Sequence, residues 1–290
     1  MSSEEERFAR ELWQRVETIH AVTYFSDEST SATAEAGVRG FWRTYFGFRA
    51  APLGPCSAAS VVATFFGFSP AMVRRAVPDA WLLLDPDEYV GLRSTSAAAA
   101  LRRLAPSVDA VTDDVLDVLE TTSVASPAAG RPLYAGNRAI PRRHDPVERL
   151  WPACTTLREH RGDGHVSALT TTGLTAPETL CLFGAEQAIP GEVFTSSRGW
   201  SDAEWVGALG ALVERGFIDD RGDATSAGRS IRAHVETVTD RLAAGPLTPL
   251  TSDQRRLLLD ALTPIARAVA DSGIIPFPNP MGLGDVRRSP

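Results

Sequence analysis

Apolar residues recur at steps of three and four along most of the chain, and this spacing is typical of amphipathic helices. The first apolar stripe falls in residues 5–25 and consists of Phe8, Leu12, Val16, Ile19 and Val22. A second helix is expected over residues 31–48, where an aromatic face formed by Trp42, Tyr45 and Phe46 precedes Arg49. Because helix signals dominate, the sequence predicts an all-α protein.

Local start signals divide the first half of the chain into further helices. These helices are expected near residues 56–66, from Pro70 onward, over residues 86–104 and near residues 109–122. Ser69 and Asp85 are the caps, since each precedes a proline in the first helical turn. The sequence therefore predicts an N-terminal helical domain over residues 1–143.

The middle of the chain changes in composition. Residues 122–143 are rich in Ser, Pro, Gly and Ala, so a connecting loop is expected there. Asp145 then caps a helix that should run to about His160, where the sequence RGDG is expected to break it. Asp163 would cap the next helix. Residues 144–172 are thus predicted to be linking helices with a joint between them.

The second half has the order of elements found in a winged helix. Its helix starts are marked by Thr175, by Ser201, by Thr225 or Ser226, and by Thr251. Gly216 ends the helix that Ser201 starts, and a short strand and a turn follow it. The sequence predicts a winged-helix-like unit with a very short wing within residues 173–290. A last helix to about Ala270 and an extended tail that frays at its end should complete it.

Composition and charge narrow the class of protein. The chain has 290 residues, which suggests about two domains, and its net charge is −7. That sign argues against a broad basic face for nucleic acid or for an anionic membrane. The N-terminus is acidic and amphipathic, unlike a signal peptide, and no apolar run is long enough to span a membrane. The three cysteines form no CxxC pattern or disulfide ladder, so a cytoplasmic location is expected.

Five segments carry a resemblance to a known family. They are RAAPLG (49–54), SPAMVRRAVPDAW (69–81), LREHRGDGHVSAL (157–169), LVERGFID (212–219) and PFPNPMGL (276–283). The chain resembles an actinobacterial family described as carrying a MarR-like winged helix-turn-helix, over almost its whole length. The resemblance implies the fold and DNA binding, and it implies no particular reaction. The chain departs from the pattern at Cys56 and Ser57, where an apolar or small residue is expected.

The charge of the expected winged helix argues against tight DNA binding. The expected recognition helix, residues 201–215, and the expected wing, residues 218–223, each have a net charge of −2. Contacts to phosphates need cations that release counterions. Arg229 and Arg232 on the following helix are the best remaining candidates. DNA is therefore a partner that the fold favours and the charge disfavours, and a winged helix that only packs or dimerises is the alternative.

The segment REHRGDGH, residues 158–165, is the densest group of reactive side chains. Two histidines and one aspartate are too few for a zinc site, and their spacing matches no zinc motif, so no metal is expected. Arg158 and Arg161 could instead hold an anionic group, and Glu159 beside His160 or His165 could form an acid–base pair. A purely structural role, with buried ion pairs locking the joint, is the competing interpretation.

Other candidates lie outside this segment. His20 and Tyr24 are four residues apart on one helix face, and Asn137 with Arg138 could close over a pocket. Core packing and a solvated loop are the simpler interpretations of these pairs. The sequence has no GxSxG, GxGxxG or P-loop motif, so no cofactor is expected.

Together these residues give a functional hypothesis. The protein is expected to be a cofactor-independent enzyme of secondary metabolism that performs elimination, rearrangement or ring closure in an interdomain pocket. Glu159, His160, His165 and Tyr24 would be catalytic. The substrate-binding residues would be His20, Asn137, Arg138, Arg158 and Arg161. The alternative is a ligand-responsive winged-helix transcription regulator, in which the same pocket senses a small molecule. A homodimer is also expected, since winged-helix proteins of this type are commonly dimers.

Overall fold

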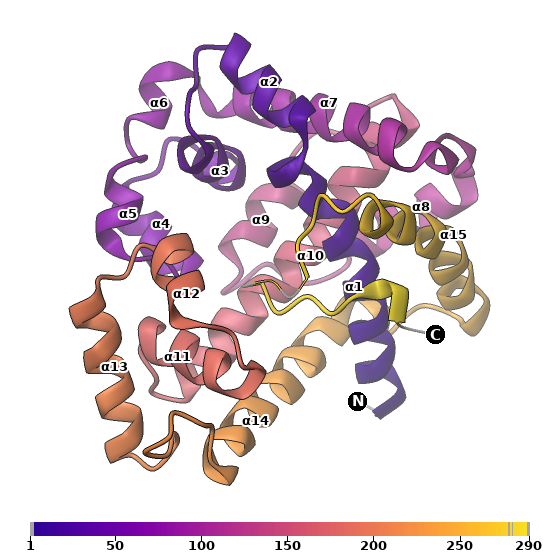
Figure 1. Ribbon diagram of the computed structural model, residues 1–290. Coiled ribbons are helices and arrows are strands. Elements are labelled where there is room, and N and C mark those ends of the chain that lie inside the picture. The colour runs from indigo at the N-terminus through magenta and orange to yellow at the C-terminus, as the bar shows by residue number, and fades with distance from the viewer. Residues whose placement is uncertain (1–2, 278, 280, 289–290) are drawn as a thin grey trace.

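The computed structural model describes residues 3–277, 279 and 281–288, and this part of the chain is all-α, as predicted (Figure 1). The central element is α10 (Pro146–Thr171), a helix of 26 residues. α1 (Ser3–Phe25), α7 (Pro86–Leu104) and α14 (Ser226–Ala244) pack against it. The only bridge between extended segments in the described residues joins Ile218 and Ala224 in antiparallel fashion.

The first half contains the predicted helices, one of which is divided in two. Its remaining helices are α2 (Asp27–Glu35), α3 (Phe41–Ala50), α4 (Ala58–Phe65), α5 (Pro70–Arg74), α6 (Ala80–Leu83) and α8 (Asp113–Ser123). The prediction of one helix over residues 31–48 is wrong, because α2 and α3 are separated by Gly37 and Gly40, both with positive φ. Ser57, where the chain departs from its resemblance, accepts a hydrogen bond from the Ser60 amide and so caps α4.

Helix α9 (Pro132–Arg138) lies inside the segment that was expected to be a loop. Pro132 occupies its first turn, where a missing amide hydrogen costs nothing. The side chain of its N-cap residue, Arg131, does not cap α9. Instead, the Asp163 carboxylate of α10 accepts a hydrogen bond of 2.8 Å from the Tyr134 amide. The helix thus depends on a residue 29 positions further along the chain.

The prediction of a joint in the REHRGDGH segment is wrong, because α10 runs through it without a break. Of the two glycines in this segment, Gly164 is required by packing. A Cβ on Gly164 would lie 2.9 Å from Nη1 of Arg131 and 3.2 Å from Cβ of Leu242. Helix propensity disfavours glycine by only about 1 kcal/mol, so packing against α9 and α14 outweighs it.

The helix-turn-helix unit consists of α11 (Ala176–Gln187), α12 (Gly191–Arg198) and α13 (Asp202–Glu214), followed by the bridge at Ile218 and the start of α14. The capping boxes predicted at Thr175 and Ser201 are present. Gly216 follows α13 with a φ of 70°. The unit has its own small core, which includes Cys181, Leu182 and Leu212. The very short wing is confirmed as a single bridge.

The C-terminal helix α15 (Ser252–Asp271) packs against α1, α7 and α8. It contributes to the main hydrophobic core together with α1, α7, α8 and α10. Short 3-10 helices complete the chain: η1 (Ala51–Leu53), η2 (Pro106–Ala110), η3 (Gly245–Leu247) and η4 (Val286–Arg288). The tail passes in front of α1 and α10 in the view of Figure 1. The end of the tail, where the sequence predicts fraying, lies outside the described residues. The division into three domains stays a prediction. None of the described helices is long and apolar enough to cross a membrane.

Candidate functional site

A cavity of about 1050 Å³ lies between the helix-turn-helix unit and the rest of the molecule. Residues from α1, α3 and α10 line one side, and residues from α11 and α12 line the other. The loop of residues 66–69 and the tail from Pro276 to Asp285 complete its wall. Ligand sites in proteins are commonly cavities of this size at the boundary between two structural units.

Aromatic rings form the wall on the α3 side. Phe41, Trp42, Tyr45, Phe65 and Phe68 line the cavity. The ring centroids of Tyr45 and Phe68 are 5.4 Å apart, and those of Tyr24 and Tyr45 are 4.6 Å apart. These distances are typical of packed aromatic pairs. The wall therefore presents a firm apolar surface to whatever occupies the cavity.

A buried chain of charges runs beneath this wall. The Glu159 carboxylate is 1% exposed and accepts hydrogen bonds from Arg49 at 3.2 Å and from Arg158 at 2.8 Å. Arg158 also donates from Nε to the Glu17 carboxylate. Burial acts to raise the pKa of Glu159, but the guanidinium groups of Arg158 and Arg49 outweigh it and lower that pKa to about 2. Glu159 is therefore ionised at neutral pH.

A second ion network joins α10 to α14 and α1. Arg161 donates to the Asp240 carboxylate at 2.6 Å, and Arg10 donates to the same carboxylate at 2.7 Å. Arg10 also bonds to Glu236 at 2.8 Å. The Arg161 guanidinium lies 4.5 Å from the centroid of the Trp13 ring. These pairs tie three helices together at one end of the cavity.

The loop of residues 66–69 ties the helix-turn-helix unit to the helical body. The Ser69 amide donates to the Arg198 carbonyl at 2.8 Å, and Trp200 donates from its indole to the Gly67 carbonyl at 3.0 Å. The Arg198 guanidinium lies 4.7 Å from the centroid of the Phe68 ring. Phe66 has a φ of 53°, a left-handed conformation that is costly for a residue other than glycine. This strained loop is the direct link between α4 and the end of α12.

His165 faces the cavity from α10 as a neutral hydrogen-bond acceptor. The Thr239 hydroxyl donates its single proton to the Val235 carbonyl at 2.7 Å. The bond of 3.0 Å between Thr239 and Nδ1 of His165 must then be donated by the imidazole. Burial lowers the pKa of His165 to about 4. At neutral pH its Nε2 is an acceptor, and the described residues supply no donor to it.

The structure brings four of the nine candidate residues to the cavity, namely Tyr24, Arg158, Arg161 and His165. Glu159 lies behind Arg49 and Arg158, and His20 lies behind Tyr24, whose hydroxyl is 3.2 Å from its Nε2. His160 packs its ring on Tyr134 of α9 instead. Asn137 accepts a hydrogen bond from Arg93, and Arg138 donates to the Ser126 carbonyl. None of these five candidates lines the cavity.

Several residues that line the cavity were not among the predicted site residues. Arg198, Phe68 and Thr179 lie far from REHRGDGH in the sequence, and no local motif marks them. In the sequence, Arg49 stands at the end of an aromatic face, and no motif marks it as a site residue. The spacing of Arg158, Arg161 and His165 by three and four residues is the one signal that could have shown which face of α10 meets the cavity.

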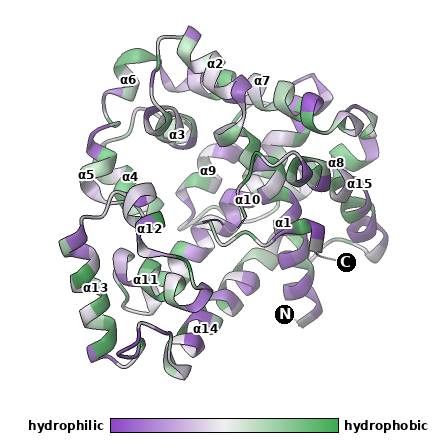
Figure 2. Ribbon diagram, in the orientation of Figure 1, coloured by the Kyte–Doolittle hydropathy of each residue, from purple (hydrophilic) through white to green (hydrophobic). Residues whose placement is uncertain are grey.

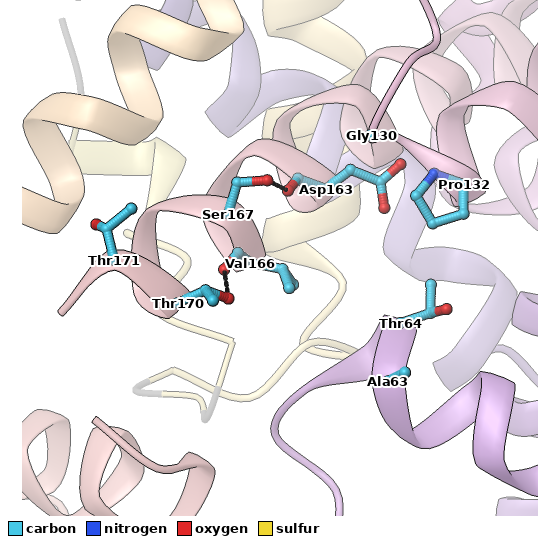
Figure 3. Close-up of a pocket in the computed structure, with 9 residues that line it drawn as sticks. All are labelled: Ala63, Thr64, Gly130, Pro132, Asp163, Val166, Ser167, Thr170 and Thr171. Atoms are coloured by element: carbon cyan, nitrogen blue, oxygen red, sulfur yellow. Dashed lines mark hydrogen bonds between the residues drawn. The ribbon is translucent and has the colours of Figure 1, made fainter. Parts of the chain in front are cut away.

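A smaller cavity of about 660 Å³ lies on another side of α10 (Figure 3). Asp163 and Ser167 line it from α10, and Thr64 lines it from α4. Burial raises the pKa of Asp163 to about 6. The described residues contain no group of three His, Cys, Asp or Glu side chains that could hold a metal ion.

The outer face of α13 has few groups suited to DNA. Val206 is 66% exposed and Val213 is 38% exposed, and Figure 2 shows hydrophobic colour along this helix at the edge of the molecule. Arg232, one of the candidate DNA contacts, donates to Glu186 instead. Arg229 donates to the Ala224 carbonyl and stays exposed. Arg215 also pairs with a carboxylate, that of Glu178, but its side chain is 37% exposed. Among the described residues, Arg215, Arg221 and Arg229 are thus the exposed cations near α13.

The fold and the cavity define the class of protein. It is a helix-turn-helix protein in which the helix-turn-helix unit and a helical body line a cavity between them. A model of the helix-turn-helix family matches residues 9–276, so the chain belongs to that family. Searches of curated proteins and of solved structures gave no match.

This membership corrects the functional hypothesis drawn from the sequence. A helix-turn-helix family that covers nearly the whole chain points to a DNA-binding regulator, so the expectation of a cofactor-independent enzyme is wrong. The alternative, a ligand-responsive regulator, is the better supported one. The buried Glu159 agrees with this correction, because both of its oxygens accept hydrogen bonds from arginines that hold it ionised.

Proposed function

We propose that the protein is a ligand-responsive transcription regulator with a MarR-like winged helix-turn-helix. A small molecule would bind in the cavity of about 1050 Å³ and change how the helix-turn-helix unit sits on the helical body. The observation that carries the proposal is the position of this cavity, which lies between the family's defining unit and α10. An occupant must contact both sides at once.

The loop of residues 66–69 supports a route from ligand to helix-turn-helix unit. Phe66, Gly67 and Phe68 line the cavity, and the same loop bonds to the Arg198 carbonyl and to Trp200. A ligand that moves this loop therefore moves the end of α12. The strained φ of Phe66 makes a second arrangement of the loop accessible at small cost, because leaving that conformation releases about 1–3 kcal/mol.

The DNA interaction would be weak and electrostatic. Arg215, Arg221 and Arg229 provide three cations per unit, and α13 is acidic at its start. Three phosphate contacts correspond to a slope of about −2.7 in log K against log salt. Binding would then fall by roughly 40-fold between 50 and 200 mM salt. Two units acting together would compensate for this weakness, since paired half-sites are read one helical turn apart.

A homodimer is therefore part of the proposal. Its mass would be twice the 31.1 kDa of one chain, which sedimentation velocity measures directly. A monomer at micromolar concentration in the presence of its duplex would remove this part of the proposal and leave the ligand site untouched.

Fluorescence anisotropy with a labelled duplex from the region upstream of the gene tests the DNA interaction. We expect binding at about 50 mM salt, the salt dependence given above, and a shallower slope for Arg221→Gln/Arg229→Gln. Arg256→Gln is the matched control, because Arg256 is exposed on α15 away from the helix-turn-helix unit. No binding at low salt, or equal binding by the double variant, would overturn the proposed regulator.

A further inference from the structure

We propose that the smaller cavity, which lies between α10 and α4, binds an organic primary ammonium group at Asp163. This site goes beyond the proposed regulator, because its lining belongs to α10, α4 and the start of α9 rather than to the helix-turn-helix unit. Val166 is the one described residue that lines both cavities. The class of ligand follows from the carboxylate, from its neighbours and from the hydroxyl groups of the wall.

A buried carboxylate lies at the base of this cavity. Asp163 is the one charged side chain among its described lining residues, and it is 4% exposed. Its Oδ2 accepts the hydrogen bond of 2.8 Å from the Tyr134 amide, whereas its Oδ1 accepts none from the described residues. Figure 3 shows the carboxylate turned toward Pro132, across from α4. Because a buried carboxylate oxygen without a donor is costly, the cavity favours an occupant that donates.

The cations near Asp163 are engaged elsewhere. Arg131 donates to backbone carbonyls of α10 and α14, and Arg49 pairs with Glu159. Burial raises the pKa of Asp163 to about 6, and Glu159 acts in the same direction. The Tyr134 amide, Arg49 and Arg131 oppose this shift but do not cancel it. A cation brought by a ligand would therefore stabilise a charge that the protein leaves partly uncompensated.

Four hydroxyl groups line the rest of the cavity as acceptors. Each donates its proton to a backbone carbonyl three or four residues earlier in its own helix, at 2.7 to 3.0 Å: Thr64, Ser167, Thr170 and Thr171. Figure 3 shows two of these bonds along α10. A hydroxyl has one proton and two lone pairs, so the described lining side chains offer acceptors and no donor. An ammonium group, which has three donors and no acceptor, complements this wall.

The space and the remaining lining residues favour an organic cation over a metal ion. The cavity of about 660 Å³ is larger than one ion needs, and Ala63, Val166 and Pro132 add apolar surface. A hard metal ion in a protein is usually held by more oxygen ligands than one carboxylate supplies. The structure thus fits a primary amine on a small body whose own hydroxyls donate to the wall, such as an amino alcohol or an amino sugar.

Matched probes separate the charge of the ligand from its donors. Ethanolamine carries both an ammonium group and a hydroxyl, choline keeps the charge but has no N–H, and ethylene glycol has neither. Glucosamine and glucose form a second pair. We expect ethanolamine and glucosamine to bind about tenfold or more tightly than their neutral counterparts, and choline to bind less tightly than ethanolamine. Potassium chloride at equal concentration should not reproduce the effect.

The Tyr134 amide is a reporter inside the site, because it donates to the Asp163 carboxylate. Leu133-Tyr134 is the one Leu-Tyr pair in the sequence. Labelling leucine carbonyl carbons and tyrosine nitrogens therefore selects this amide in an NMR spectrum of the full chain without DNA. Its shift, followed against probe concentration, gives Kd.

The reporter also tests the dependence on pH. An ammonium group binds the ionised carboxylate, so affinity for ethanolamine should fall as the pH drops through about 6. A saturating concentration of ethanolamine should in turn lower the pKa that the Tyr134 amide reports. Ethylene glycol should change neither quantity.

Variants locate the ammonium group. Asp163→Asn keeps an acceptor for the Tyr134 amide and should weaken ethanolamine about tenfold or more, with little change for ethylene glycol. Thr64→Val keeps the shape of the wall, removes one acceptor and should weaken ethanolamine by about two- to fivefold. Asp260→Asn is the matched control, because Asp260 is an exposed carboxylate on α15 outside the cavity.

Three outcomes would overturn the inference. They are ethylene glycol that binds as tightly as ethanolamine, choline or potassium that shifts the Tyr134 amide as strongly as ethanolamine, and ethanolamine affinity that is equal in Asp163→Asn and the parent. If Asp163→Asn does not fold, an affinity that is unchanged in Thr64→Val and constant from pH 8 to pH 5 would overturn it instead. These results are independent of DNA binding, so the proposed regulator and the ammonium site stand or fall separately.

Discussion

Replacing Glu159 with Gln removes the negative charge on which two buried arginines converge. Arg49 and Arg158 keep their positions in α3 and α10, and the Glu159 side chain is 1% exposed. Arg158 retains the Glu17 carboxylate, but Arg49 loses the one carboxylate that it contacts in the described residues. A guanidinium is then left buried with Tyr45 and the Phe65 ring as its neighbours.

Two estimates of the effect agree. Removing one partner of a buried ion pair costs about 3–5 kcal/mol. The pKa of Glu159 is lowered from 4.5 to about 2 in the folded protein, with burial opposing and Arg158 and Arg49 favouring the shift. That difference corresponds to about 3 kcal/mol of folding free energy. We therefore expect Glu159→Gln to reduce the free energy of unfolding by about 3 kcal/mol at neutral pH.

The direction of the Glu159 pKa shift determines how the stability difference between parent and variant depends on pH. A carboxyl whose folded-state pKa lies below its unfolded value stabilises the fold above that unfolded value, and the stabilisation disappears as the pH falls through the folded-state pKa. The difference between parent and variant, measured by urea unfolding, should be constant from pH 7 to about 5 and should shrink toward pH 2. Glu28→Gln is the control, because the Glu28 pair with Arg103 is on the surface and should contribute under about 1 kcal/mol.

A compensating variant keeps this prediction testable even if Glu159→Gln unfolds. Adding Arg49→Met removes the arginine left without a carboxylate and should recover part of the lost stability. Equal stability of parent and Glu159→Gln would refute the reasoning. So would a difference that does not change between pH 7 and pH 3, because the ion pair would then not be its source.

Two further predictions concern α10 itself. Gly164→Ala should destabilise by about 1–3 kcal/mol, because its Cβ would lie 3.2 Å from Cβ of Leu242 and would displace the Arg131 guanidinium from its hydrogen bonds to the His160 and Leu242 carbonyls. Gly162→Ala, whose Cβ meets nothing closer than 3.4 Å, should be neutral or stabilising by up to about 1 kcal/mol. Thermal unfolding separates the two variants, and a similar loss in both would contradict the packing argument. Asp163→Asn should gain stability relative to the parent as the pH rises through about 6, because burial raises the pKa of Asp163 and the parent must then bury a charge. Urea unfolding at pH 4.5 and 8 measures this, and parent and variant curves that stay parallel would exclude Asp163 as the source.

Local signals in the sequence predicted where helices begin better than where they end. Ser69, Asp85 and Thr175 cap the helices that follow them, because a cap needs only its own side chain and the next three amides. The break expected after His160 failed because the requirement for glycine at Gly164 comes from α9 and α14, which are distant in sequence. Asp163 does cap a helix, but that helix is α9. Residue type indicates that a side chain caps, and only the fold decides which amide it reaches.

The candidate site was predictable to the extent that it lies on one helix. With α10 unbroken, Arg158, Arg161 and His165 share the face that lines the cavity, whereas Glu159 and Asp163 point toward other partners. Side chains of consecutive helical residues point in all directions around the helix axis. The number of reactive side chains in REHRGDGH therefore overstated how many of them can meet one ligand. The rest of the wall includes residues of α3, α11 and α12, and no pattern within one segment predicts that these helices meet α10.

Arg158 lines the cavity and also stabilises the fold through its ion pairs. A ligand that contacts Arg158 would therefore affect the packing of the helices that these ion pairs join. Arg158 connects α10 to Glu17 of α1 and, through Glu159, to Arg49 of α3. A ligand shifts the position of the helix-turn-helix unit only by the difference between its affinities for two arrangements. A ligand that contacts Arg158 and Phe68 would act on the ion pairs that hold α1 and α3 and also on the ring over which the Arg198 guanidinium lies. The ligand's affinity therefore depends on both sides of the cavity at once, and an arrangement that separates them binds it less tightly.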